Sequence, residues 1–273
     1  HASGSYQEAN VSFKTAPLYM AFGENGLNSV STQFQKFVSG QLKNNPASRK
    51  PRPVHFNCWE AVYFQHSLER LKNLAQTAAE LGAERFVLDD GWFGKRNSDE
   101  SSLGDWNVNC EKYPNGLSPL IDHINHLGLE FGLWFEPEMV NKQSDLFINH
   151  PDWILGSPDQ NLGRNQLVLD MSKSEVIDYL YNSISEILSK YEVDYVKWDH
   201  NRVLPIVDAN QTYGLYELLA RLNRSYPEVE IESCSSGGGR MDFGILDFTQ
   251  RLWLSDSNDA VARMQIQNNS AMF

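Results

Sequence analysis

The feature that most constrains the fold is a pattern that repeats from residue 54 onward. A short apolar run rich in β-branched and aromatic residues is followed each time by a segment with helical periodicity. The predicted strands occupy residues 54–60, 85–93, 130–138, 193–201, 229–236 and 248–256. Strands that alternate with helices form parallel sheets, because each helix returns the chain to the same end of the sheet. The sequence therefore predicts an α/β fold.

The segments between these strands support this prediction. In residues 67–82, apolar side chains recur at the i, i+3, i+4 spacing of an amphipathic helix, and Gly82 suits a helix C-terminus. Residues 174–191 have the same periodicity, as do residues 214–227, which stop at a proline. We expect a helix in each of these segments.

Six strand–helix units favour a (β/α)8 barrel of the TIM type over a doubly wound sheet, since no G-x-G-x-x-G motif follows the first strand. Only 17 residues follow the sixth predicted strand, too few for two further units, so the barrel is expected to be truncated there. Residues 1–50 are rich in Gly, Ser, Asn and Gln, and a Pro- and base-rich stretch lies at 44–53. We interpret 1–50 as the end of a preceding domain plus a linker, and 51–273 as the barrel domain, incomplete at its C-terminus.

Composition excludes several classes of partner. The net charge of −12 argues against nucleic acid, which needs clustered Lys and Arg. No apolar run approaches the roughly 20 residues of a membrane span, and no signal segment opens the chain, so the cytoplasm is the default location. The three cysteines form no C-x-x-C pair, and His123 and His126 have no third ligand nearby, so we expect neither a metal nor a cofactor.

Carboxylates gather where the predicted strands end. They are Glu60, Asp89, Asp90, Glu136, Glu138, Asp199 and Asp256. A single Asp in such a place is usually a helix cap, but the carboxyl ends of barrel strands all meet at one face, where active sites lie. Convergent carboxylates indicate either a divalent metal site or cleavage of a glycosidic bond.

The strand with the sequence YVKWDHNR favours the second alternative. Side chains alternate along a strand, so Lys197 and Asp199 share one face, while Trp198 and His200 point the other way. A cation on the same face favours the ionised form of Asp199, and an ionised carboxylate at a barrel mouth is a suitable nucleophile for an anomeric carbon. The alternative is a structural Lys–Asp ion pair.

Six motifs then resemble glycoside hydrolase family 36, the microbial α-galactosidase family. They are LDDGWF (88–93), GLWFEPEMV (132–140), GRNQLVLD (163–170), YVKWDHNR (195–202), ESCSSGGGR (232–240) and WLSDSNDA (253–260). The resemblance covers roughly residues 50–273. It implies a retaining α-galactosidase that hydrolyses terminal α-galactosides of the melibiose and raffinose type.

The resemblance also implies roles for individual residues. Asp199 would be the nucleophile and Asp256 the general acid/base, with Asp259 the less favoured candidate. The residues implied to bind the sugar are Trp59, Asp89, Asp90, Arg164, Lys197, Cys234 and Ser236. Many family members have Gly at position 236. The side chain of Ser236 adds a hydroxymethyl group there, which would affect the substituent that the site accepts at C2 or C6 of the sugar if it faces that position.

Several alternatives stay open. Relatives with this resemblance include α-N-acetylgalactosaminidases and enzymes that transfer galactose. A metal-dependent barrel lyase or racemase would use the carboxylates as Mg²⁺ ligands, with Lys197 as its base. A non-enzymatic reading is an inactive fragment, because an unclosed barrel exposes two sheet edges that invite aggregation or pairing. The expected partner is a small oligosaccharide, and a homo-oligomer is compatible with the sequence.

Overall fold

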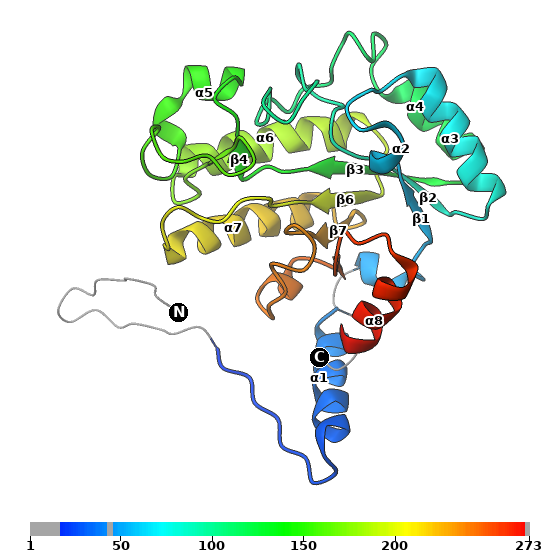
Figure 1. Ribbon diagram of the computed structural model, residues 1–273, viewed down its shortest axis with the longest axis vertical. Coiled ribbons are helices and arrows are strands. Elements are labelled where there is room, and N and C mark those ends of the chain that lie inside the picture. Colours follow the sequence, from blue (N-terminus) through cyan, green and yellow to red (C-terminus); the bar gives the residue numbers. More distant parts are fainter. Residues whose placement is uncertain (1–16, 43–45, 271–273) are drawn as a thin grey trace.

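The computed structural model describes residues 17–42 and 46–270. Its centre is a six-stranded sheet in the order β1-β2-β3-β6-β7-β8, and every neighbouring pair is parallel (Figure 1). The strands are β1 (His55–Asn57), β2 (Arg85–Leu88), β3 (Glu130–Phe135), β6 (Tyr195–Trp198), β7 (Glu230–Ser233) and β8 (Arg251–Leu252). Each lies within a predicted strand, and each is shorter than predicted because its last residues leave the sheet to form the rim. The predicted parallel α/β fold is confirmed.

In the described residues the sheet curls into a six-stranded half-barrel, which is consistent with the predicted barrel truncated after its sixth strand. Strands β1 and β8 form its two edges and do not pair with each other. Side chains nevertheless connect them, since the Arg251 guanidinium lies 3.2 Å from Nδ1 of His55 and Arg52 hydrogen-bonds the Gln250 carbonyl. The curvature therefore brings the first and last strands towards the same interior.

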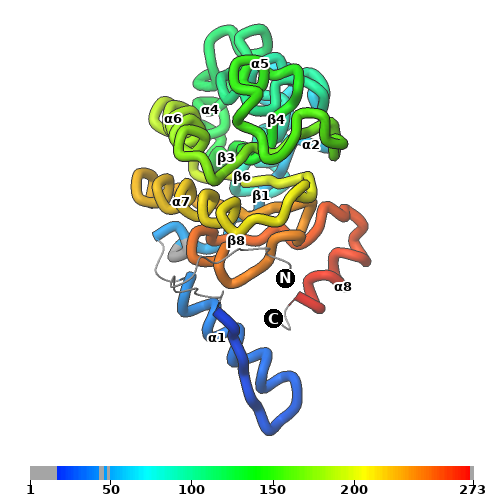
Figure 2. Tube along the Cα trace, turned by 90° about the vertical axis from the view of Figure 1, so that its left-hand side faces the viewer, coloured from blue at the N-terminus to red at the C-terminus, as the bar shows by residue number. Residues whose placement is uncertain are grey.

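Helices cover the outer face of this sheet. Figure 2 shows α6 and α7 on one side of the strands. The main outer helices are α3 (Leu68–Glu80), α4 (Ser118–His126), α6 (Ser174–Lys190) and α7 (Ala209–Ser225). The predicted helices are confirmed, although α7 begins five residues earlier than expected because Asp208 caps it by accepting from the Asn210 amide. Gly82 follows α3 with a φ of +87°, a left-handed conformation that glycine adopts without steric cost.

The remaining helices and strands complete the described chain. They are α1 (Leu27–Leu42), α2 (Trp59–Val62), α5 (Asp145–Asn149) and α8 (Ala260–Ser270), the 3-10 helices η1 (Pro46–Arg49), η2 (Pro151–Trp153) and η3 (Ile245–Asp247), and the antiparallel pair of β4 (Met139–Val140) and β5 (Leu167–Val168). Among the described residues, no helix is long and apolar enough to cross a membrane.

Helix α1 lies in the region that we expected to be a domain end and linker. It extends away from the sheet (Figures 1 and 2), yet aromatic contacts tie it to the barrel. The ring of Phe243 lies 5.7 Å from that of Phe34 and 5.6 Å from that of Phe37. The prediction from the sequence missed this helix because it rested on the Gly-, Ser-, Asn- and Gln-rich composition of residues 1–50, although Leu27, Val30, Phe34, Phe37 and Leu42 recur at helical spacing. The domain boundary near residue 50 stays a prediction.

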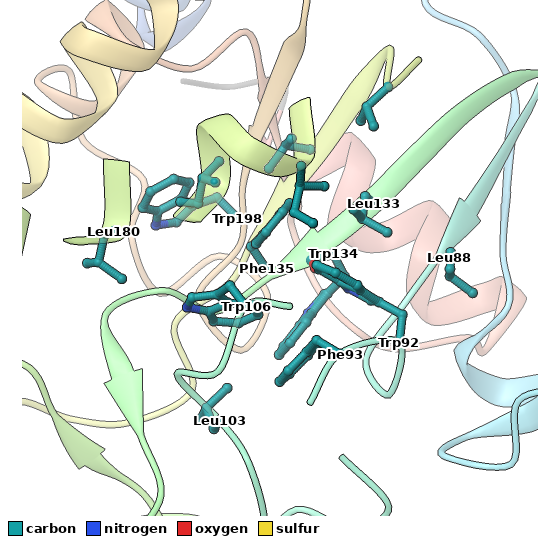
Figure 3. Close-up of a cluster of buried hydrophobic side chains, with 14 of the residues drawn as sticks. Leu88, Trp92, Phe93, Leu103, Trp106, Leu133, Trp134, Phe135, Leu180 and Trp198 are labelled. Atoms are coloured by element: carbon teal, nitrogen blue, oxygen red, sulfur yellow. The ribbon is translucent and has the colours of Figure 1, made fainter. Parts of the chain in front are cut away.

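An aromatic cluster fills the space beneath the carboxyl edge of the sheet (Figure 3). Trp92, Phe93, Trp106, Trp134 and Phe135 are at most 3% exposed, and neighbouring ring centroids lie 4.4–6.3 Å apart. Burial of such large rings contributes most of the hydrophobic stabilisation of a core. The Trp92 indole also donates to the Trp134 carbonyl at 2.9 Å, which fixes the cluster to β3.

Candidate active site

A cavity of about 450 Å³ opens at the carboxyl edge of the sheet and continues into the half-barrel. Seven of the nine site residues expected from the sequence line it: Trp59, Asp89, Asp90, Arg164, Lys197, Asp199 and Asp256. Lys197 lies within β6 and Arg164 lies in the turn after Gly163. The other five residues lie in the segments that follow β1, β2, β6 and β8. The parallel sheet therefore brings together residues that are far apart in the sequence, as expected for strand ends in a barrel.

Asp199 follows β6 and is 7% exposed. Its Oδ2 accepts hydrogen bonds from the Asn201 amide (2.6 Å) and the Trp134 indole (3.2 Å), and its Oδ1 accepts from the His200 backbone N–H (2.8 Å). Burial alone would raise the pKa of Asp199. The charge of Lys197 and these hydrogen bonds outweigh burial and hold the pKa below its usual range. Asp199 is therefore an ionised, rigidly held carboxylate.

Lys197 supplies the nearby positive charge. Its Nζ lies 3.2 Å from Oδ2 of Asp89, which also accepts from the Asn57 amide at 2.5 Å. Burial would lower the pKa of Lys197, but the charges of Asp89 and Asp199 raise it above its usual value. The predicted alternation along β6 is confirmed, since Lys197 and Asp199 line the cavity while Trp198 is buried in the hydrophobic core.

Asp90 is held from outside the cavity. Arg96 donates to both of its carboxylate oxygens, at 2.9 and 2.8 Å, and also to the Asn141 side chain at 2.9 Å. Lys112 secures the same loop, because its Nζ donates to the carbonyls of Phe64, Gly91 and Arg96 at 2.8–2.9 Å. A bidentate Arg–carboxylate pair fixes both position and orientation. Asp90 therefore faces the cavity in a defined geometry.

Asp256 lies in the exposed segment between β8 and α8. Its Oδ1 accepts from the Trp253 indole at 2.6 Å, and both residues line the cavity. Asp259, the less favoured candidate, does not line the cavity. Its carboxylate accepts from the Ala262 amide at 2.7 Å, which is the hydrogen bond of a helix N-cap at the start of α8. The structure thus gives Asp259 a structural role and leaves Asp256 facing the cavity.

Arg164 and Trp59 form other parts of the rim. Arg164 sits in a turn, closed by Gly163 and Gln166, with a φ of +50°. Burial raises the pKa values of both Asp90 and Glu136, and the charge of Arg164 partly opposes this rise, so its guanidinium acts on the carboxylate cluster. Trp59 packs edge-on against Tyr63 and Phe64, at centroid distances of 5.2 and 5.1 Å. Its ring is therefore held in place as one wall of the cavity.

Two expected residues do not line the cavity. Cys234 is 1% exposed and hydrogen-bonds Asp199. Ser236 is exposed, but its hydroxyl donates to Oδ1 of Asn201 at 3.0 Å. Both follow β7 and contact the segment after β6, Cys234 at Asp199 and Ser236 at Asn201.

Sequence reasoning missed several cavity residues: His55, Phe56, Asn57, Trp134, Tyr195, Asn201, Glu232, Trp253 and Asn258. The period of two along each strand could have found some of them. Tyr195 lies two residues before Lys197, and His55 and Asn57 lie four and two residues before Trp59. Glu232 lies deep in the half-barrel, where burial raises its pKa to about 7.

Glu136 lies beside Asp199 and is 1% exposed. It accepts from the Asn201 backbone N–H at 2.6 Å and from the Gln166 side-chain amide at 2.9 Å. Burial raises its pKa to about 8, and the charges of Asp199 and Asp90 add to this effect. Glu136 is therefore a neutral carboxylic acid at neutral pH, next to an ionised aspartate.

This difference predicts a pH effect on stability. An unfolded Glu has a pKa near ~4.3, so the folded protein binds the additional proton. The stabilisation from Glu136 is then complete below about pH 4 and lost progressively as pH rises through about 8. With Glu136→Gln, thermal unfolding midpoints should show the variant gaining stability relative to the unsubstituted protein between pH 5 and pH 8.5. Gln166 can rotate its amide to accept from the introduced one, since its Oε1 has no partner.

The control is the same substitution at Glu175, an exposed residue in the first turn of α6. It separates the effect of Glu136 from a general effect of removing one negative charge. A midpoint difference for Glu136→Gln that stays constant over this pH range would contradict a neutral Glu136.

Among the residues that the structure describes, no group of three or more His, Cys, Asp or Glu side chains is arranged to hold a metal ion. The cavity carboxylates instead face nitrogen donors. Asp89 faces Lys197, Asp90 faces Arg96, and Asp199 accepts from Asn201 and Trp134.

A curled parallel sheet with several carboxylates around one cavity at its carboxyl edge is typical of barrel-type glycoside hydrolases. The comparisons with known proteins agree with this class. The family described as Melibiase matches residues 12–273. The chain belongs to the melibiase family, and the resemblance to glycoside hydrolase family 36 is confirmed.

Curated relatives include an α-galactosidase from Escherichia coli, 47% identical over 274 residues, which cover 97% of this chain and 38% of the relative. The α-galactosidase AgaA from Geobacillus stearothermophilus is 44% identical over 276 residues, or 96% of this chain and 38% of the relative. The chain thus spans little more than a third of the length of these relatives.

Solved structures show the same similarity. The family 36 α-galactosidase AgaB from Geobacillus stearothermophilus has a TM-score of 0.87 at 43% identity, over 92% of this chain and 37% of that one. A variant of AgaA in complex with stachyose has a TM-score of 0.86 at 42% identity, with the same coverage. The half-barrel described above is therefore part of the fold of larger enzymes.

Proposed function

We propose that this chain carries the catalytic centre of a retaining α-galactosidase, which removes terminal α-galactosyl residues from oligosaccharides of the melibiose and raffinose type. The relatives in the family bear the name α-galactosidase, and solved structures of AgaA variants hold stachyose or raffinose. The observation that carries the proposal is that Asp199 and Asp256 line one cavity, with Asp199 ionised by Lys197.

The proposed reaction is a double displacement. Asp199 attacks the anomeric carbon while Asp256 gives its proton to the glycosidic oxygen, so the bond to the leaving sugar breaks as the bond to Asp199 forms. Asp256, now a base, takes a proton from water, and the water oxygen displaces Asp199 from the anomeric carbon. Two inversions return galactose in its original α configuration. This mechanism requires the two carboxyl groups to lie about 5–5.5 Å apart.

The remaining cavity residues suit the recognition of a neutral sugar. Asp89 and Asp90 present carboxylate oxygens whose positions are fixed by Lys197 and Arg96, and fixed acceptors of this kind can bind sugar hydroxyl groups. Trp59 offers an aromatic wall and Arg164 a donor at the rim. In the protein at its natural length, we propose that further strands complete the half-barrel to a (β/α)8 barrel.

The test compares three substrates with the protein at its natural length. We expect hydrolysis of p-nitrophenyl α-galactoside and of raffinose, at least about 100-fold faster than hydrolysis of p-nitrophenyl α-N-acetylgalactosaminide; cleavage is expected to be unchanged by a chelator. Proton NMR of the first product should show α-galactose before it mutarotates. Preference for the N-acetylated substrate, galactosyl oligosaccharides as the main product, or β-galactose released first would each overturn part of the proposal.

A further inference from the structure

The segments that follow β6 and β7 stay in contact after the two strands stop pairing. The last paired residues are Trp198 and Ser233. Beyond them, the Cys234 backbone N–H donates to the Trp198 carbonyl at 2.8 Å, and the Ser235 hydroxyl donates to the His200 carbonyl at 3.0 Å. The Ser236 hydroxyl then donates to Oδ1 of Asn201. Residues 234–236 thus hold the segment that carries the proposed nucleophile.

The Ser236 hydroxyl anchors the side-chain amide of Asn201. Oδ1 of Asn201 accepts from Ser236 at 3.0 Å, so Nδ2 faces Asp199 and donates to its Oδ2 at 2.6 Å. The backbone N–H of Asn201 is held separately by Glu136 at 2.6 Å. A flipped amide would place its oxygen against the Asp199 carboxylate, where two acceptors repel. The acceptor-only carboxylate of Asp199 therefore sets the orientation of the amide, and the Ser236 hydroxyl holds the other end of the amide in place.

The backbone of Ser236 is in an unusual conformation. Its φ is +46°, in the left-handed region that residues other than Gly seldom adopt because it brings Cβ close to the backbone. Glycine would remove this close approach and lose the hydroxyl. Strained residues of this kind persist where the side chain has a use. Here the strained turn points the hydroxyl at Asn201.

We propose that Ser236 is a positioning residue that acts on the proposed nucleophile Asp199 through the amide of Asn201, without touching the substrate. The inference rests on the proposed function, because it concerns the rate of attack by Asp199. It also reassigns Ser236 from a residue that selects sugar substituents to one that holds a hydrogen-bond donor in place.

The first experiment is Ser236→Ala in the protein at its natural length. Ser236→Ala leaves the Asn201 amide less firmly held, which weakens its hydrogen bond to the charged carboxylate of Asp199. We therefore expect kcat for p-nitrophenyl α-galactoside to fall about 10-fold. KM should change by less than about 2-fold, since no sugar contact is lost. The acidic limb of the pH profile should move to higher pH, because the carboxylate of Asp199 loses a donor. Ser172→Ala, which removes an exposed hydroxyl after β5, is the matched control and should behave as wild type.

The second experiment is a double-mutant cycle with Asn201→Ala. If Ser236 acts only through Asn201, Ser236→Ala has no further effect on kcat in the Asn201→Ala background. The ratio of activities on α-galactoside and α-N-acetylgalactosaminide should also stay constant in Ser236→Ala. An equal loss in both backgrounds, or a changed ratio, would mean that Ser236 contacts the sugar and would overturn the inference.

The two proposals fail in different ways. If wild type cleaves α-galactosides, Asp199→Ala does not, and Ser236→Ala matches wild type, only the positioning role fails. If wild type does not cleave α-galactosides, the proposed function fails. The order and position of the Asn201 amide are then read from crystal structures of Ser236→Ala, and an amide that stays as well ordered at an unchanged distance from Asp199 would contradict the role of Ser236.

Discussion

Asp199→Ala is expected to lower kcat for p-nitrophenyl α-galactoside by at least about 10⁴-fold, because no covalent intermediate can form without the carboxylate. The substitution leaves an opening beside the anomeric carbon. Azide should enter it and restore part of the rate by attacking in place of Asp199. This single displacement inverts the configuration, so the product should be β-galactosyl azide, identified by the coupling constant of its anomeric proton.

The control for this experiment is Asp178→Ala, which removes a surface carboxylate of α6 whose partner is Arg221. It should retain wild-type kcat, since exposed ion pairs contribute little to stability. Retention of more than about a tenth of the activity in Asp199→Ala, or an α-configured azide product, would refute the assignment of the nucleophile.

Asp256→Ala should give the second-largest effect, and its size should depend on the leaving group. A general acid contributes roughly 10²–10⁴-fold when the leaving oxygen needs a proton. Raffinose has such a leaving group and should lose activity most strongly. Galactosides of acidic phenols need little protonation, so their first step should be nearly unaffected and the covalent intermediate should accumulate. Azide then attacks that intermediate from the opposite face and gives α-galactosyl azide.

The opposite configurations of the two azide products distinguish the two aspartates in one assay. Asp259→Ala serves as the comparison, because Asp259 caps α8. Loss of an N-cap costs about 1 kcal/mol of stability, so this variant should unfold at a lower temperature with no dependence of its rate on the leaving group. If Asp259→Ala rather than Asp256→Ala shows the leaving-group dependence, the roles of the two residues are exchanged.

Much of the fold could be predicted from local patterns. The six strands, helices α3, α6 and α7, and the shared face of Lys197 and Asp199 all follow from periodicity, which depends only on neighbours in the chain. Seven site residues also line the cavity as expected, because parallel strands end at one edge.

The contacts that tune the site could not be predicted in this way. Trp134 and Asn201 reach Asp199 through three-dimensional packing, and the partner of Ser236 is 35 residues away in the sequence. Nor could periodicity reveal that Cys234 contacts Asp199 without lining the cavity, since the position of Cys234 depends on where strand β7 ends. Helix α1 could have been predicted, because Val30, Phe34 and Phe37 recur at helical spacing, but its contacts with Phe243, more than 200 residues away, could not.

The indole of Trp134 belongs to two parts of the molecule at once. Its ring packs in the aromatic cluster at the carboxyl edge of the sheet, while its N–H donates to Asp199. A change of ring size at Phe93 or Trp106 would therefore be expected to shift a hydrogen-bond donor of the proposed nucleophile. If Asp199 has that role, substitutions in this interior cluster would alter turnover as well as folding, although neither residue lines the cavity.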